Sequence, residues 1–278
     1  MNLALLRKGG KRQIGDWFLR GSSILFLALI VIIPLVVIFQ DGLREGFSSF
    51  QYQVTLPIAK HAILLTLWTS VLMTIINALM GLITAYVLVR YEFPGKRLLN
   101  AIVDLPLAIP TLVTGIMLVI LYGPQQSLGS FMIEKLNFRI VFAPPGIILA
   151  LLFITFPFVV RTIQPILEEL DRSQELAAAT LGASPWRIFR KVVLPVLILP
   201  TLGGSLLSFS RAVGEFGAVV IVAGNIPLRT QTAAVYVFSQ VESENRLGAS
   251  AVSIVLILIS FTVLLIANTI HKYWGAHR

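Results

Sequence analysis

The chain has 278 residues, of which 56% are hydrophobic and 13% charged, and its mean hydropathy is +0.87. These values exclude an ordinary soluble domain and predict a polytopic, all-α membrane protein. The absence of cysteine excludes disulfides and thiolate metal sites, and the net charge of +9 does not indicate a nucleic-acid partner, because basic residues flanking membrane spans produce the same excess.

Six apolar stretches are long enough to cross a hydrocarbon core of about 30 Å. They cover residues 22–39, 62–89, 98–122, 145–160, 192–223 and 248–270. Each is expected to be a helix, because every backbone polar group inside lipid must be paired within the protein. Six transmembrane helices are therefore predicted, with five or seven left open, and the fourth is expected to continue beyond Arg161.

The first stretch has a basic flank, as a signal sequence does, but it is longer than a usual signal core. No small-residue cleavage site stands before Gln40 and Asp41, so we predict an uncleaved N-terminal anchor at about 22–39. No linker or repeat divides the chain. Residues 1–278 are predicted to form one transmembrane domain, with its core at about 62–270.

The distribution of lysine and arginine predicts the orientation, because cytoplasmic flanks carry the excess of both. With the N-terminus in the cytoplasm, that side receives Arg7, Lys8, Lys11, Arg12, Arg20, Arg90, Lys96, Arg97, Arg161, Arg172, Arg187, Arg190, Lys191, Lys272 and Arg278. The opposite side receives only Arg44, Lys60, Lys135, Arg139, Arg229 and Arg246. Both termini are therefore predicted to be cytoplasmic.

The third stretch contains Asp104, Pro106 and Pro110 near its predicted cytoplasmic end. Proline lacks a backbone N–H and breaks or kinks a helix. Two roles remain open for Asp104: its carboxylate either caps the freed backbone amides or pairs with a basic residue of a neighbouring helix.

A polar segment, residues 171–195, separates the fourth and fifth stretches. Asp171 and Gln174 have capping-box spacing, which predicts the start of a helix. Gly182 is placed to end that helix in a left-handed turn. Ser184 and Pro185 then predict the N-cap and first position of a second short helix. The polar segment is therefore expected to form two short helices with a sharp bend between them, on the cytoplasmic side.

Arg211 and Glu215 lie within the fifth stretch, four residues apart and so on one face of a helix. Charges at membrane depth normally pair with one another or line an aqueous path. The pair is therefore either a structural ion pair that fixes a bend, or part of a path for a charged solute. The hydroxyl of Ser208 is either a donor to that solute or bonded to a helix carbonyl.

The polar segment resembles the cytoplasmic loop of binding-protein-dependent ABC importer permeases, whose pattern is Glu-Ala-Ala, three residues, Gly, nine residues, Ile, one residue, Leu-Pro. The positions that fit are Ala177, Ala178, Gly182, Val192 (for Ile), Leu194 and Pro195. Leu176 occupies the Glu position, and the acid stands one residue earlier as Glu175. Residues 89–115, 157–170 and 208–227 are similar to the sulfate/thiosulfate branch of this family, especially its T-type subunit.

The resemblance implies a type I ABC importer permease fold with a cytoplasmic coupling helix, in a bacterial inner membrane. Two separate cytoplasmic ATPases would dock on the polar segment and hold ATP and Mg, since no lysine is followed by Ser or Thr as a P-loop requires. The implied coupling residues are Glu175, Ala177, Ala178, Gly182, Trp186 and Pro195. Trp186 and Phe189 either fill a groove of the ATPase or pack against the chain's own helix ends.

The resemblance also implies a second permease subunit, either a similar W-type chain or a copy of this one, and an external sulfate-binding protein. Arg211 would then meet an oxyanion near an external gate, with Glu215 holding it when substrate is absent and Ser208 adding a hydroxyl. No cofactor or metal is predicted on the chain itself. Three alternatives remain open. The substrate could be molybdate, tungstate or another oxyanion, and the polar segment could be only a solvated linker. The chain could also be an intramembrane enzyme that uses Asp104, Glu175 or Glu215 as acid or base.

Overall fold

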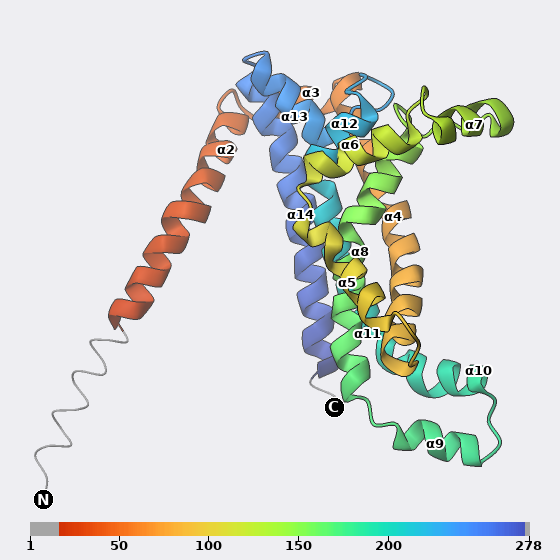
Figure 1. Ribbon diagram of the computed structural model, residues 1–278. Helices are drawn as coiled ribbons and strands as arrows, with labels where there is room; N and C mark the ends of the chain where they lie inside the picture. Colours follow the sequence, from red (N-terminus) through yellow and green to blue (C-terminus); the bar gives the residue numbers. More distant parts are fainter. Residues whose placement is uncertain (1–16, 276–278) are drawn as a thin grey trace, which may run out of the picture.

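The computed structural model describes residues 17–275, which form helices and connecting turns and no strand (Figure 1). The predicted cytoplasmic residues Arg7, Lys8, Lys11, Arg12 and Arg278 lie outside this range. Five helices are long and apolar enough to cross a membrane: Trp17–Leu43, Pro57–Arg90, Pro144–Glu169, Pro185–Val213 and Arg246–Thr269. A bent pair, Lys96–Ala108 with Thr111–Tyr122, makes six if it counts as one span.

The first of these helices contains a π-helical turn, η1 (Ala28–Ile32), followed by α2 (Ile33–Leu43). The remaining elements are α3 (Phe47–Thr55), α4 (Pro57–Arg90), α5 (Lys96–Ala108), α6 (Thr111–Tyr122), α7 (Ser127–Leu136), α8 (Pro144–Glu169), α9 (Ser173–Thr180), α10 (Pro185–Ile188), η2 (Phe189–Val193), α11 (Leu194–Val213), α12 (Gly217–Ala223), α13 (Ala233–Glu242) and α14 (Arg246–Gly275). As predicted, the fourth span continues as a helix beyond Arg161.

Helices α4, α8 and α11 pack against one another and form the centre of the bundle. Glycines allow their backbones to approach closely, because a Cβ at Gly81 would lie 2.7 Å from Val159 Cγ1, and one at Gly204 would lie 2.9 Å from Val159 Cα. One buried polar pair joins two of these helices: Asn77 Nδ2 of α4 donates to Thr155 Oγ1 of α8 over 2.9 Å.

The third predicted span, 98–122, is two helices, α5 and α6, that meet at an angle of 111°. The prolines predicted the break but not its size. Ile109, which precedes Pro110, has an extended backbone with φ −84° and ψ 127°, as the proline ring requires. Beyond the break α6 packs on α12, where a Cβ at Gly115 would lie only 2.8 Å from the Ala218 carbonyl oxygen.

The fifth predicted span, 192–223, differs from the structure at both ends. The helix begins at Pro185, because the π-helical turn η2 joins α10 to α11, so the second helix of the polar segment runs directly into the span. It ends at Val213, and α12 is a separate helix after Gly214. The prediction that Arg211 and Glu215 share one continuous helix is therefore wrong.

Helices α9 and α10 lie at the same end of the bundle as the last turns of α14 and the first turns of the N-terminal helix (Figure 1). Helices α3, α7, α12 and α13 lie at the opposite end (Figure 1). The polar segment therefore projects from one end of the bundle. The two helix breaks, at Ile109–Pro110 and at Gly214, lie nearer the opposite end (Figure 1).

Candidate functional site

The polar segment forms the predicted helix–turn–helix, with a different cap at its start. The two carboxylate oxygens of Asp171 accept from the backbone N and the hydroxyl of Ser173, over 2.9 and 2.5 Å. These hydrogen bonds lower the pKa of Asp171, and the helix begins at Ser173. Gly182 adopts the predicted left-handed conformation, with φ +82°. Ser184 and Pro185 take the N-cap and first positions of α10, although the Ser184 side chain makes no capping bond.

The carboxylate of Glu175 points toward the chain's own α4. Its Oε1 lies 2.7 Å from Nη2 of Arg90, the last residue of that helix, and the two side chains are only 17% and 7% exposed. Nearby, Arg172 donates from Nη2 to the Val89 carbonyl over 3.3 Å. Glu175 thus fastens α9 to α4. Leu176, which occupies the glutamate position of the family pattern, has an exposed side chain and does not take part in this contact.

An exposed apolar surface covers the outer side of the polar segment. Leu181 is 88% exposed and Trp186 68% exposed. Trp186 stacks on Phe189 with ring centroids 5.7 Å apart, and Phe189 meets the ring of Tyr86 on α4 edge-on at 5.0 Å. Phe189 therefore packs against the chain's own helices, whereas Trp186 remains available. Large apolar side chains exposed on a polar protrusion are typical of a protein-interaction site.

The remaining predicted coupling residues lie around this surface. Ala177, Gly182 and Pro195 are exposed, and Ala178 is half-buried. Leu176, on the same short helix, adds a further exposed apolar side chain. The sequence pattern thus marks a surface on which most members face away from the bundle, with Glu175 as the member that faces inward.

Arg211 and Glu215 form an ion pair across the break between α11 and α12. Arg211 Nη1 lies 2.7 Å from Glu215 Oε2. The other carboxylate oxygen of Glu215 accepts from the backbone N of Ala218 over 3.1 Å, which caps α12. The Glu215 side chain is 2% exposed and that of Arg211 38%. The pair therefore joins the end of α11 to the start of α12, as a structural ion pair would, while part of the Arg211 side chain stays exposed.

The guanidinium of Arg211 nevertheless has N–H donors that make no hydrogen bond within the described residues. It carries five N–H donors, and within residues 17–275 Glu215 is its only polar partner. Ser208, in contrast, is fully buried among α4, α8 and α11. Its hydroxyl lies 3.4 Å from the Thr155 carbonyl oxygen, so in this conformation it is part of the core and does not face an open path.

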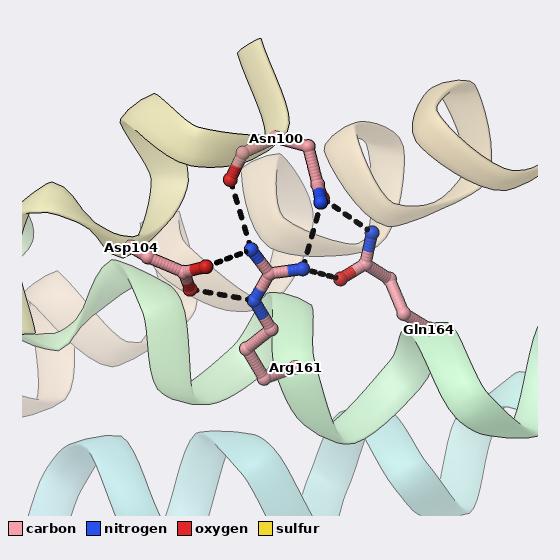
Figure 2. Close-up of polar contacts among 4 residues, drawn as sticks. All are labelled: Asn100, Asp104, Arg161 and Gln164. Atoms are coloured by element: carbon pink, nitrogen blue, oxygen red, sulfur yellow. Dashed lines mark hydrogen bonds and ion pairs between the residues drawn. The ribbon is translucent and has the colours of Figure 1, made fainter. Parts of the chain in front are cut away.

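A cluster of four residues, of which the sequence analysis considered only the pairing of Asp104 with a basic residue, joins α5 to α8 (Figure 2). Arg161 of α8 donates from Nε and Nη2 to the two carboxylate oxygens of Asp104, over 2.7 and 2.5 Å. It also donates to Asn100 Oδ1 and to the Asn100 carbonyl oxygen, each over 2.9 Å, and to Gln164 Oε1. We call these four residues the arginine cluster. Of the two roles considered for Asp104, pairing with a neighbouring helix is confirmed.

A polar cavity of about 600 Å³ adjoins the arginine cluster at the end of the bundle that carries the polar segment. Its lining comes from the end of α4, the turn after it, the start of α5, and α8, and includes Glu92, Lys96, Arg97, Arg161 and Glu168. Lys96 donates from Nζ to Glu92 over 2.7 Å, and this hydrogen bond lowers the pKa of Glu92.

The three acids considered for intramembrane catalysis do not converge. Asp104, Glu175 and Glu215 each belong to a different ion pair, with Arg161, Arg90 and Arg211 respectively. Within the described range, no group of three or more His, Cys, Asp or Glu side chains is arranged to hold a metal ion. The arrangement is that of helices tied together by arginine–carboxylate pairs.

Comparisons with known proteins agree with this geometry. Residues 77–275 match the family described as "Binding-protein-dependent transport system inner membrane component". The chain is 43% identical over 248 residues to a "probable sulfate transport system permease protein cysT" of Nephroselmis olivacea, covering 89% of this chain and 87% of that one. It is 40% identical over 253 residues to the "sulfate transport system permease protein CysT" of Synechocystis sp., covering 91% and 88%.

Solved structures show the same fold at low sequence identity. A chain of a bacterial alginate ABC transporter, in complex with a periplasmic protein bound to alginate pentasaccharide, superposes with a TM-score of 0.79 at 15% identity and 96% coverage of both chains. A chain of the inward-facing MetNI methionine ABC transporter gives 0.56 at 16% identity, over 76% of this chain and 95% of that one. Because the family match spans most of a multi-helix membrane chain, and relatives align over nine-tenths of it, the chain belongs to the binding-protein-dependent transport family, as a permease subunit of an ABC importer.

Proposed function

We propose that the chain is a permease subunit of an ATP-dependent sulfate importer in a bacterial inner membrane. The observation that carries this proposal is the identity of 40–43% to proteins named as sulfate transport permeases. The branch-specific segments include both Asp104 and the Arg211–Glu215 pair. They therefore contain charged residues that form ion pairs in the structure. Thiosulfate is proposed as a second substrate on the resemblance alone.

The polar segment is proposed to receive two cytoplasmic ATPases, which would hold ATP and Mg. Two features of the segment support this role. Leu181 and Trp186 offer an apolar surface for a groove on the partner, and Gly182 sets a tight bend that presents both. The segment continues into α8 on one side and α11 on the other. ATP-driven closure of the ATPases would therefore move two central helices together, as alternating access requires.

Arg211 is proposed to lie on the path of the oxyanion. Its free donors and its partly exposed side chain favour this role, because a sulfate dianion needs charge-assisted hydrogen bonds in place of its water. Glu215 would hold the guanidinium in place when no substrate is present. The Ser208 hydroxyl would join the path only if α11 shifts relative to α8, because it is buried in this conformation.

An external sulfate-binding protein is proposed to dock at the end of the bundle opposite the polar segment, over residues 224–247, which include α13. A second permease, either a W-type chain or a copy of this one, would complete the path. In this arrangement the polar segment and both termini would be in the cytoplasm. It agrees with the lysine and arginine distribution, since Arg90 ends α4, Arg172 directly precedes α9 and Arg187 belongs to α10, and α9 and α10 lie together at one end of the bundle (Figure 1).

Uptake of labelled sulfate tests the proposal. A bacterial strain that lacks its sulfate permease pair is supplied with this chain and its neighbouring transport genes, and uptake is measured with sulfate, thiosulfate or molybdate as competitor. Restored uptake that unlabelled sulfate suppresses supports the assignment. If molybdate uptake is restored and sulfate uptake is not, the proposed substrate changes from sulfate to another oxyanion. No uptake of any oxyanion by an assembled complex would contradict the function itself.

A further inference from the structure

Helix α5 is attached to the bundle mainly through α8. The attachment is the arginine cluster, in which Arg161 of α8 holds Asn100 and Asp104 of α5 (Figure 2). Beyond the cluster α8 continues to Glu169, and α9 of the polar segment begins at Ser173. At 1.5 Å per residue, Arg161 lies about 12 Å along the helix from Glu169. The cluster therefore stands close to the point where the polar segment joins the membrane helices.

All five N–H donors of the Arg161 guanidinium are used. Nε contacts Asp104, Nη1 contacts Asn100 and Gln164, and Nη2 contacts Asp104 and Asn100. Gln164 Nε2 also donates to Asn100 Oδ1 over 3.2 Å, which closes the network. An anion could bind Arg161 only by displacing one of these partners. The geometry is that of a clamp between two helices, in contrast to the largely free guanidinium of Arg211.

The arginine cluster lies next to a proline in α8, where the helix bends more easily. Pro165, one helical turn after Arg161, has no backbone N–H to donate to the Arg161 carbonyl oxygen, so α8 bends more easily at this turn. Any tilt of the last turn of α8 changes the relative positions of Arg161 and Gln164. Because both side chains hold Asn100, a bend there would pull directly on α5.

Helix α5 leads in turn to the other end of the bundle. It ends at the break next to Pro110, and α6 beyond the break packs on α12. Helix α12 is the one that Glu215 caps while holding Arg211. A continuous series of contacts therefore runs from the polar segment through α8, the arginine cluster, α5 and α6 to the Arg211–Glu215 pair.

We propose that Arg161 is a positioning residue for transport: it makes α5 follow the polar-segment end of α8, so that movement of the polar segment reaches the break between α5 and α6 and the Arg211–Glu215 pair beyond it. This inference rests on the proposed coupling to ATPases. It assigns to Arg161 no contact with substrate, and it makes the clamp, as well as the polar segment, necessary for coupling ATP hydrolysis to uptake.

Distance measurements between two spin labels test this relay, and the natural absence of cysteine allows labelling of introduced cysteines without background in this chain. Leu107→Cys on α5 and Phe261→Cys on α14 replace exposed side chains. The labelled chain is assembled with its partner subunits, and the distance is measured with and without a non-hydrolysable ATP analogue. The labelled parent complex must retain sulfate uptake, and its distance is expected to shift when nucleotide binds.

In the Arg161→Gln background the shift is expected to vanish, and sulfate taken up per ATP hydrolysed is expected to fall at least about fivefold, the lower range of allosteric coupling. Assembly and basal ATP hydrolysis are expected to remain. Arg139→Gln is the matched control, since it removes an equal charge from an exposed position and is expected to change neither quantity. Arg161→Lys, which keeps the charge but loses the planar set of donors, is expected to be intermediate.

The inference is overturned if Arg161→Gln retains the nucleotide-dependent shift and the uptake per ATP of the parent. If Arg161→Gln does not assemble, Asp104→Asn replaces it, because an amide oxygen still accepts from Arg161 while the charge is lost. Failure of both variants to assemble would make the cluster purely structural and would also overturn the relay. If the parent complex itself shows no nucleotide-dependent shift, the proposed coupling to ATPases is wrong, and the relay with it.

Discussion

The ion pair between Arg90 and Glu175 is expected to hold α9 in place, and its removal gives the sharpest test of the structure. Helix α9 has eight residues and none of them is buried. Isolated helices shorter than about 12–15 residues are marginal in water, so α9 depends on contacts with the rest of the chain. Its one ion pair joins Arg90 Nη2 and Glu175 Oε1 over 2.7 Å, between side chains that are 7% and 17% exposed.

Arg90→Ala would leave the Glu175 carboxylate without its partner. Truncation of one member of a buried ion pair costs about 3–5 kcal/mol. Glu175 retains some contact with water and can turn outward once α9 is released, so we expect the lower end, about 3 kcal/mol. Since every 1.4 kcal/mol is about tenfold in an equilibrium constant, the ratio of docked to undocked α9 should fall about a hundredfold.

Hydrogen–deuterium exchange of the purified chain measures this change directly. Backbone amides of Ser173–Thr180 should exchange about a hundredfold faster in Arg90→Ala, because their exchange follows the population of the open state. Lys96→Ala is the matched control: it removes an ion pair of the same 2.7 Å length whose acid is 87% exposed, and exposed pairs contribute little. Exchange in Arg90→Ala within about twofold of the parent would refute the reasoning.

Three further predictions concern other parts of the chain. Gly182→Pro should uncouple ATP hydrolysis from uptake in the assembled complex, because proline cannot adopt the φ of +82° at this turn; normal uptake per ATP would contradict the role of the bend. Arg211→Ala should lower sulfate uptake while the complex still assembles on a size-exclusion column, and loss of assembly alone would favour a purely structural ion pair. Gly204→Val should destabilise the chain by about 1–3 kcal/mol or more in thermal unfolding, because its Cβ would lie 2.9 Å from Val159 Cα; an unchanged unfolding temperature would contradict the close packing of α8 and α11.

The features predicted correctly from the sequence are those set by neighbouring residues. Hydropathy placed the long spans, since an apolar stretch in lipid has to be helical. Gly182 ends α9 in the left-handed conformation, as expected for a helix followed by glycine. Pro110 stands at the break that was expected in the third span, whereas Pro106, also named as a possible break, lies inside α5. Each of these depends on the chemistry of a few consecutive residues and on no distant partner.

The predictions that differ from the structure concern how far a helix continues past a local break. The fifth stretch was expected to be one continuous helix over 192–223, yet α11 ends at Val213 and Glu215 caps the separate helix α12 while it pairs with Arg211. In the same way α5 ends before Ile109, and α6 continues at an angle of 111° to it and packs closely on α12 through Gly115. These contacts join residues of different helices, and they stabilise the end of a helix over its continuation with a bend. A hydropathy profile holds no information about such contacts.

The sequence by itself determined a helical membrane protein, the polar segment with its glycine turn, and the family to which the chain is similar, because composition, periodicity and motif spacing are properties of the linear chain. Only the tertiary structure decided which arginine meets which carboxylate. Arg90 with Glu175 and Arg161 with Asp104 lie far apart in the chain, and many flanking lysines and arginines were equally plausible partners. The choice follows from the packing of α4, α5 and α8, which brings these side chains within hydrogen-bond distance in surroundings where an unpaired charge is costly.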